Sequence, residues 1–203
     1  MGQLIVTEFA TLDGVAQAPG APDEDRDAGF AHGGWQAPYI DEAGVDDVFA
    51  AARTMDALLL GRRTYEIFAD YWPTAPADMP FTTLLDEVPR YVASRTLSAP
   101  LRWDGTNLLE GDLAESVPAL TERYGEVHVI GSLDLVQSLL RLGLVDRLDL
   151  WVHPLVLGTG KRVFAEGAPP AALRLTRSVT YPNGALHLRY EPAGTPTYGT
   201  IGE

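Results

Sequence analysis

The sequence predicts an α/β fold in which a mixed, mainly parallel central sheet carries helices on both faces and ends in an antiparallel hairpin. Three observations support this fold class. Short apolar runs typical of buried strands alternate with amphipathic helical segments, as in parallel sheets that are covered on both sides. Several of these runs end abruptly at a glycine or serine before a helix begins. Near the C-terminus, Asn183-Gly184 indicates a two-residue turn between two strands.

The first part of the chain is expected to hold two strands, a long loop and a helix. A polar corner at Thr11-Leu12-Asp13-Gly14 ends the first strand. The loop that follows contains three prolines, an acidic run and several aromatic residues without a sustained period, so it either packs on the protein as a lid or is disordered. The expected elements are a strand over 4–10, the loop over 15–39, a helix over 41–54 and a strand over 55–61. The inner stripe of the helix is predicted to be Val45, Val48, Phe49 and Ala52.

The rest of the chain repeats the pattern of strand, polar turn and helix. Prolines end two short helices, Asp112 and Ser132 are expected to cap two longer ones, and Pro154 should bend a long strand because it lacks a backbone donor. The expected elements are helices over 64–71, 81–87, 113–124 and 133–142, and strands over 90–96, 107–110, 126–131, 146–157, 173–181 and 185–191. One domain over 1–192, followed by a flexible tail over 193–203, is therefore predicted.

Composition excludes several classes of function. The chain has 203 residues with 28 acidic and 15 basic side chains, and its net charge of −13 argues against broad contact with nucleic acid or an anionic membrane. It has no cysteine, and no pair of its four histidines has metal-ligand spacing, so we expect neither disulfides nor a metal site. No segment approaches about 20 uninterrupted apolar residues and no signal-peptide pattern opens the chain, so a cytoplasmic protein is expected.

Residues 57–66 carry the clearest functional signal. A four-residue apolar run ends at Gly61, and Arg62, Arg63 and Thr64 come before apolar residues at helical spacing, so a buried strand is expected to turn into a helix there. Unpaired backbone N–H groups and the dipole at the start of such a helix attract phosphate, and two cations and a hydroxyl add to this attraction. The alternative is that the glycine makes a tight turn and the arginines are solvated.

Two further strand exits carry similar chemistry, and ligands of parallel sheets bind beyond the carboxyl ends of the strands. Two helix N-termini and a group of arginines suit a dinucleotide, with Arg63 or Arg95 on a ribose 2′-phosphate. No acidic residue at a matching strand end could bind a ribose 2′-hydroxyl, which favours NADP over NAD. The candidate cofactor-binding residues are Gly61, Arg62, Arg63, Thr64, Ser94, Arg95, Gly131, Ser132 and Leu133.

Five short motifs follow one another in the chain. They are Thr11-Leu12-Asp13-Gly14, Leu60-Gly61-Arg62-Arg63-Thr64-Tyr65-Glu66, Val92-Ala93-Ser94-Arg95, Ile130-Gly131-Ser132, and Gly143-Leu144-Val145-Asp146 leading to Pro154-Leu155-Val156-Leu157-Gly158. In this order, over residues 3–192, they resemble the dihydrofolate reductase-like reductases, and most closely the branch related to the C-terminal reductase domain of the bifunctional riboflavin-biosynthesis deaminase/reductase. The resemblance implies a dihydrofolate reductase-like three-layer fold and NADPH as the cofactor.

Three departures limit what the resemblance implies about the substrate. Folate reductases hold the pterin with a carboxylate on the first helix, and counting back from Gly61 without gaps puts Val45 there, with Asp46 and Asp47 on other faces. The segment that usually follows the cofactor turn in riboflavin reductases is missing from residues 67–77. The family's Gly-Gly at its third cofactor turn is also Gly-Ser here, which leaves one less flexible step for a phosphate.

Asp13 is the candidate catalytic residue. The end of the first strand suits an acid or an orienting group beside the nicotinamide, although aspartate is also common in turns, where it bonds to its own backbone. The candidate substrate-binding residues are Gly14, Trp35, Phe49 and Tyr65. For Phe49 and Tyr65, a place in the hydrophobic core is the alternative.

These observations predict an NADPH-dependent reductase that passes hydride to a C=O or C=N group of a small heterocyclic or ribosylated substrate, with 5-amino-6-(5-phosphoribosylamino)uracil as one candidate. The alternatives are a non-catalytic NADP(H)-binding or sensing protein and a true dihydrofolate reductase. A homodimer is expected as well. The alternation of strand 146–157 would expose Trp151 and His153 on a sheet face that a partner could cover, and relatives in the riboflavin branch dimerise.

Overall fold

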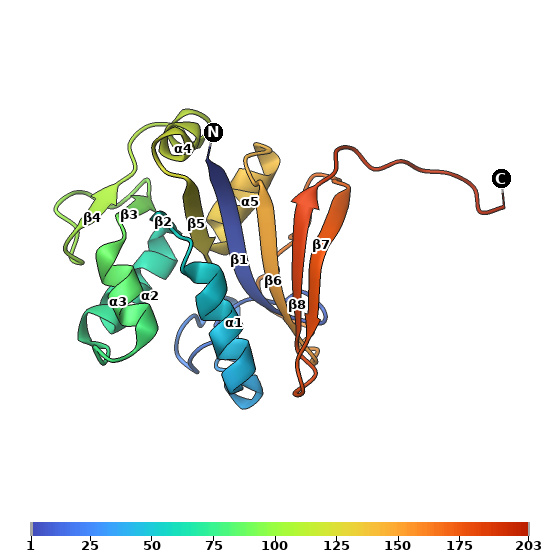
Figure 1. Cartoon of the computed structure of the whole chain (residues 1–203), viewed down its shortest axis with the longest axis horizontal. Coiled ribbons are helices and arrows are strands. Elements are labelled where there is room, and N and C mark those ends of the chain that lie inside the picture. Colours follow the sequence, from blue (N-terminus) through green and yellow to red (C-terminus); the bar gives the residue numbers. More distant parts are fainter. Residues whose placement is uncertain (1, 203) are drawn as a thin grey trace.

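An eight-stranded mixed sheet runs through the computed structural model, which describes residues 2–202 (Figure 1). The strands are β1 (Gln3–Thr11), β2 (Ala57–Gly61), β3 (Arg90–Ala93), β4 (Thr106–Leu108), β5 (Glu126–Ile130), β6 (Arg147–His153), β7 (Leu173–Thr180) and β8 (Leu186–Pro192). Their order is β4-β3-β2-β5-β1-β6-β8-β7, and every neighbouring pair is parallel except β6 with β8 and β8 with β7. The predicted fold class is confirmed. Beyond β8 the chain leaves the sheet and extends away from it (Figure 1).

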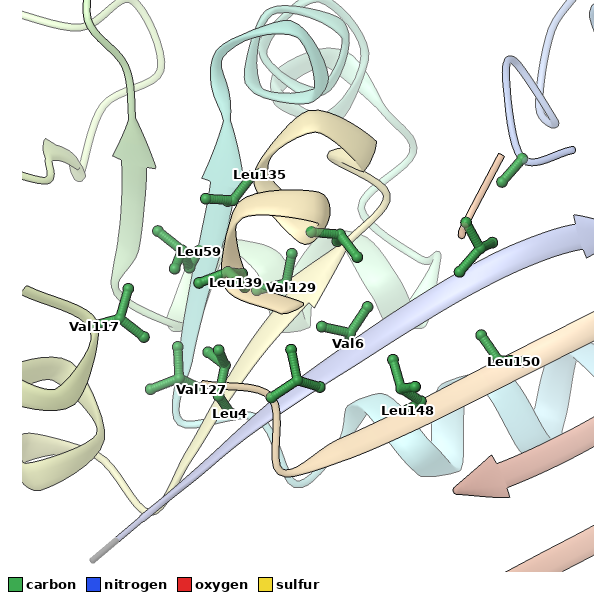
Figure 2. Packing of buried hydrophobic residues seen from close by; sticks show 14 of the residues in the cluster. Leu4, Val6, Leu59, Val117, Val127, Val129, Leu135, Leu139, Leu148 and Leu150 are labelled. Carbon is green, nitrogen blue, oxygen red and sulfur yellow. The ribbon is translucent and has the colours of Figure 1, made fainter. Parts of the chain in front are cut away.

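Helices cover both faces of this sheet. They are α1 (Glu42–Ala52), α2 (Arg62–Tyr71), α3 (Pro80–Glu87), α4 (Leu113–Arg123) and α5 (Leu133–Arg141), with 3-10 turns at Asp27–Gly29, Ala37–Tyr39 and Trp72–Thr74. The largest hydrophobic cluster joins the sheet to α4 and α5, where Leu59, Val127 and Val129 meet Val117 and Leu139 (Figure 2). Within residues 2–202, none of the helices has the length and apolar character needed to cross a membrane.

The opposite face of β2 and β3 is covered by α2 and α3. Leu58 and Leu60 point away from Leu59 and pack with Tyr65 of α2 and Leu85 of α3 in a second cluster. This explains why β2 is a continuous apolar run, since both of its faces are buried. Tyr65, a candidate substrate-binding residue, is 1% exposed and belongs to this cluster, so its place is in the core and not on a pocket wall.

α1 is rotated relative to its predicted register. Val45, which was expected on the inner stripe, is 49% exposed, whereas Val48 packs on the cluster that surrounds Trp151. Asp47, which was expected on another face, points to the sheet: its carboxylate accepts a hydrogen bond from the hydroxyl of Tyr181 and lies 2.8 Å from Nδ1 of His187. The prediction is therefore wrong for Val45 and Asp47, whereas Val48, Phe49 and Ala52 lie on the inner side as predicted. Apolar periodicity could not place this helix because one of its inward residues is a charged group with buried partners.

The C-terminal hairpin has a three-residue loop and not the predicted two-residue turn. The backbone N–H of Tyr181 donates to the carbonyl of Ala185, and the N–H of Gly184 donates back to the carbonyl of Tyr181. Gly184 has a φ of 85°, the left-handed conformation that completes a three-residue hairpin loop. The glycine was therefore read correctly as a turn residue, but the loop begins one residue earlier, at Pro182.

β6 is shorter than predicted, and its aromatic residues are covered by the protein itself. The strand ends at His153, directly before Pro154. Trp151 and His153 are 3% and 4% exposed, because the ring of Trp151 stacks on His187 at 3.9 Å and the ring of Trp35 lies 5.3 Å from His153. The exposed aromatic face from which a homodimer was inferred does not exist, and the homodimer stays a prediction without this support.

The long loop after β1 is packed against the sheet end. Phe30 and Trp35 are buried with Val15 and Ala18 in a cluster of their own, and the indole N–H of Trp35 donates to the carbonyl of Gln17 at 2.8 Å. This confirms the lid and not the disordered alternative. Trp35, a candidate substrate-binding residue, fixes the lid through its hydrogen bond to Gln17 and its contact with the ring of His153.

Glu8 is a buried carboxyl group in the middle of β1. It is 2% exposed, and its Oε1 has no hydrogen-bond partner within residues 2–202. Because burial disfavours the charged form, the pKa of Glu8 is raised to about 8. The side chain is therefore protonated at neutral pH.

Replacement of Tyr65 by Phe tests the core position of this residue. The hydroxyl of Tyr65 accepts a hydrogen bond from the backbone N–H of Trp103 at 3.2 Å. Tyr65→Phe should lower the free energy of unfolding in urea by about 1–3 kcal/mol, since a buried donor loses its acceptor. Tyr71→Phe, on the exposed end of the same helix, should change it by less than about 0.5 kcal/mol. Equal effects would contradict the core assignment.

Ionisation of Glu8 should make stability depend on pH. Its pKa is about 8 in the folded protein and 4.5 for the unperturbed group, so the folded state binds more protons between these values. The free energy of unfolding should therefore fall as pH rises from about 5 to 9, by at most about 5 kcal/mol. Glu8→Gln should remove this slope. Parallel urea-unfolding profiles for the two proteins across the range would contradict the assignment.

Candidate cofactor and substrate site

Two of the predicted cofactor turns are joined directly at the carboxyl edge of the sheet. β2 and β5 are parallel neighbours, so Gly61 and Gly131 leave the sheet side by side. The N–H of Gly61 donates to Oγ of Ser132 at 2.9 Å, and the N–H of Ser132 donates to Oγ1 of Thr64 at 3.0 Å. The structure thus brings together Gly61, Thr64, Gly131 and Ser132, as the strand-exit argument predicted.

The helices that follow these turns have uncapped N-termini. Gly61 precedes α2 and Ser132 precedes α5, and neither helix receives a side-chain hydrogen bond at its cap. Ser132 holds the N-cap position of α5 as predicted, but its side chain does not cap the helix, because its Oγ accepts from the N–H of Gly61 and donates to the carbonyl of Ile130. Helix N-termini without side-chain caps at one edge of the sheet have the N–H groups and dipoles that attract an anion.

The chain reaches this geometry through two successive left-handed residues. Gly131 has a φ of 57° and Ser132 a φ of 64°. For a residue with a side chain this conformation costs roughly 1–2 kcal/mol, which explains why glycine is usual at both positions in the family that the sequence resembles. The hydrogen bonds of the Ser132 hydroxyl and N–H offset that cost. Serine can therefore hold the left-handed conformation that this turn requires.

The third strand exit lies beside the first, because β3 pairs with β2. Oγ of Ser94 accepts hydrogen bonds from the N–H groups of Thr96 and Leu97 at 3.1 Å and 3.0 Å, which closes the turn. Arg95 is exposed and makes no ion pair within residues 2–202. It is therefore free to meet an anion at this edge.

Arg63 is held by the lid. Its guanidinium forms ion pairs with Asp25, at 2.7 Å, and with Asp27, and the same two carboxylates bind the ammonium group of Lys161 at 2.6 Å and 2.9 Å. Burial alone would raise the pKa of Asp25, but the hydrogen bond from Lys161 and the charge of Arg63 lower it. Arg63, which was predicted to bind the ribose 2′-phosphate, therefore already has acidic partners. Arg62 pairs with Glu66 at 3.2 Å on the surface of the helix.

Sequence reasoning missed the contribution of the loop after β6. A cavity of about 230 Å³ lies between the first turns of α5, including the candidate residue Leu133, and the loop that carries Gly160, Lys161 and Arg162. The signal that could have found it is the motif Gly158-Thr159-Gly160-Lys161-Arg162, where two cations follow two glycines at the end of a strand. This loop adds basic side chains to the N-terminus of α5.

Asp13 anchors that loop. Its carboxylate accepts hydrogen bonds from the hydroxyl of Thr11 at 2.6 Å and from the N–H groups of Leu157 and Gly158 at 3.2 Å and 2.9 Å. The bond from Thr11 and those from the loop backbone lower the pKa of Asp13 to about 2. Asp13 is therefore ionised at neutral pH and cannot serve as a proton donor there, and its role as an orienting group stays a prediction.

Two candidate substrate residues lie outside the core. Gly14, with a φ of 80°, follows Asp13 in the turn, and its carbonyl accepts a hydrogen bond from the N–H of Val163. Phe49 is half-buried on α1, with its ring 5.7 Å from that of Phe81 of α3. Their part in substrate binding stays a prediction.

Comparison with known proteins shows which family and which relative this chain is similar to. The model of the RibD C-terminal domain family matches residues 3–187. The uncharacterized protein YyaP of Bacillus subtilis is 27% identical over 141 residues, which cover 67% of this chain and 73% of that protein.

Solved structures share the fold. A putative riboflavin biosynthesis protein from Shewanella sp. PV-4 superimposes with a TM-score of 0.72 and 21% identity, over 94% of this chain and 98% of that one. A diaminohydroxyphosphoribosylaminopyrimidine deaminase/5-amino-6-(5-phosphoribosylamino)uracil reductase from Thermotoga maritima gives a TM-score of 0.63 and 16% identity, over 95% of this chain and 57% of that one. The family model spans nearly the whole chain, so the protein belongs to the RibD C-terminal domain family.

Proposed function

We propose that the protein is an NADPH-dependent reductase that transfers hydride to a C=O or C=N group of a small heterocyclic or ribosylated substrate. The observation that carries this proposal is the meeting of two uncapped helix N-termini at the turns Gly61 and Gly131, linked through Ser132. Membership of the RibD C-terminal domain family supports it, and the solved Thermotoga maritima relative is described as a uracil-derivative reductase. NADPH supplies the hydride when it is bound.

The residues of this edge fit a dinucleotide phosphate. The N–H groups at the start of α2 and α5 would bind the pyrophosphate, with Thr64 and Ser132 fixing the two turns against each other. Arg95, which is exposed and unpaired within residues 2–202, would take the ribose 2′-phosphate. Arg63 would instead hold the lid over the site through Asp25. Asp13 would keep the loop of Lys161 in place beside α5.

A non-catalytic binding or sensing protein is the second candidate, and the lid favours it. Asp25 and Asp27 join the first cofactor turn to the loop after β6, so the lid contacts both elements that would touch the cofactor. NADPH binding without oxidation in the presence of a panel of carbonyl, imine, pterin and ribosylated pyrimidine compounds would support this candidate over the reductase.

Cofactor choice is tested by titrating NADPH and NADH against tryptophan fluorescence. NADPH should bind more tightly, and Arg95→Ala should weaken NADPH by about ten- to a hundredfold, since a charged hydrogen bond to the 2′-phosphate is worth roughly 1.5–3 kcal/mol. Affinity for NADH should not change. Arg174→Ala, on an exposed arginine of β7, is the matched control and should leave both affinities unaltered. Equal binding of the two cofactors by the wild type would refute the proposal.

Dihydrofolate should be a poor substrate. Val45 is exposed, and both oxygens of Asp47 are occupied by Arg177, Tyr181 and His187, so neither position offers a free carboxylate to a pterin. Asp46 lies on the exposed side of α1. A missing proton-transfer group typically costs 10²–10⁴ in rate. NADPH oxidation with dihydrofolate should therefore be slow or absent. Fast oxidation that Asp47→Asn abolishes would show that Asp47 leaves its partners to serve the pterin, and the substrate class would be wrong.

A further inference from the structure

A second polar cavity lies at the other end of the sheet. Its volume is about 310 Å³, at the lower limit of pockets for small molecules, and it is enclosed by α1 and the sheet residues of β5 to β8. It is lined by the first residues of β5 and β6, Glu126 and Arg147, whereas Gly131 follows the last residue of β5. At roughly 3.3 Å per residue, the cavity and the proposed cofactor turn are about 16 Å apart along β5. The proposed reductase site does not use it.

Most acceptor positions of the acidic groups around the cavity already have partners. Oε2 of Glu126 accepts a hydrogen bond from the hydroxyl of Thr54 and lies 3.6 Å from Nη2 of Arg147. Oδ1 of Asp149 accepts a hydrogen bond from Nε of Arg189 at 2.8 Å and lies 2.9 Å from Nε2 of His187, and Oδ2 accepts from Nε of Arg147 at 3.0 Å. Burial alone would raise the pKa of Asp149, but the hydrogen bonds from His187 and Arg189 lower it to about 2. Asp47, which also lines the cavity, has both oxygens occupied. Few acceptor positions on these two carboxylates remain for a ligand.

The arginines, in contrast, keep unused donors. Among the contacts within residues 2–202, Arg189 forms hydrogen bonds only through Nε, and Arg177 only through one terminal nitrogen, to Asp47. Arg147 bonds through Nε, and its Nη2 lies 3.6 Å from Oε2 of Glu126, which leaves its other terminal nitrogen unused. Each guanidinium has five N–H donors in a planar fork. Several terminal N–H groups therefore lack a protein acceptor, and the side chains that carry them line the cavity. A cavity rich in donors and poor in acceptors is suited to an anion.

The pairing of the hairpin adds independent support. Arg177 of β7 lies directly opposite Arg189 of β8. Like charges at directly opposed positions destabilise an antiparallel pair. Asp47 of α1 forms an ion pair with Arg177, and Asp149 of β6 forms one with Arg189. These two ion pairs offset the repulsion and hold both guanidinium groups at the cavity instead of letting them separate into solvent.

We propose that this cavity is a binding site for a small organic anion with a phosphate or carboxylate group, held by Arg147, Arg177 and Arg189. Arginine forks bind both groups in a bidentate manner, which gives the site its chemical preference. Asp149 and Asp47 position the forks, and the exposed side chain of Arg177 leaves one side of the cavity open for entry. The site is separate from the proposed cofactor site, so it provides a second position at which a metabolite can bind.

Calorimetric titration with inorganic phosphate, and separately with succinate, tests the proposal at a constant ionic strength of about 0.15 M. Ala50→Glu adds a carboxylate to the cavity wall at an exposed position of α1. It leaves Arg147, Arg177 and Arg189 themselves unchanged. Ala43→Glu makes the same change on α1 at an exposed position outside the cavity, so it is the matched control. Circular dichroism checks that both variants fold.

At least one of the two anions should bind the wild type with a dissociation constant below about 1 mM. Ala50→Glu should weaken that binding at least tenfold, and Ala43→Glu should not. Arg177→Gln, which removes the least buried fork, should also weaken it. Comparison of the two anions decides between phosphate and carboxylate as the preferred group. Absence of binding by both, or equal binding in the wild type and Ala50→Glu, would overturn the proposal, the latter because the anion would then occupy another basic site.

Discussion

The reciprocal hydrogen bonds of Ser132 are the contact on which the proposed site depends. They join the turn after β2 to the turn after β5, although the paired residues are 71 and 68 positions apart in the chain. Without this link, two helix N-termini would end near each other with no fixed spacing. With it, the positive ends of α2 and α5 face one space, which is the basis of our proposal that backbone groups bind a dinucleotide pyrophosphate there. A left-handed serine is the cost of this arrangement.

The lid completes the site by electrostatics as well as by packing. Phe30 and Trp35 fix it to the end of the sheet, and its acidic run meets cations from two different elements, Arg63 and Lys161. This explains the acidic run in a protein that would bind an anionic cofactor. Asp25 and Asp27 would repel such a cofactor less than free carboxylates, because both pair with Arg63 and Lys161. They also tie the lid to the turn after β2 and to the loop after β6.

The two sides of α1 make different contacts. One side of the helix presents Phe49 to α3, while Asp47 reaches the other side and joins the charged network of β6, β7 and β8. A buried carboxylate with all of its acceptors used contributes orientation and not reactivity, since it holds Arg177 and its neighbours in fixed positions. The same helix therefore packs on α3 through Phe49 and lines the anion cavity through Asp47.

The sequence by itself determined the fold class, the strand and helix order and the residues of the cofactor turns. These features depend on local periodicity and on glycine, which act over a few neighbouring residues. Tertiary structure decided the rotation of α1, the burial of Trp151, the partners of Arg63 and the existence of the arginine cavity. Each of these depends on charged side chains from elements distant in sequence, such as Asp47 with His187, or Asp25 with Lys161. A single sequence contains no signal for such pairing, because a charged residue reads as solvent-exposed until its buried partner is known.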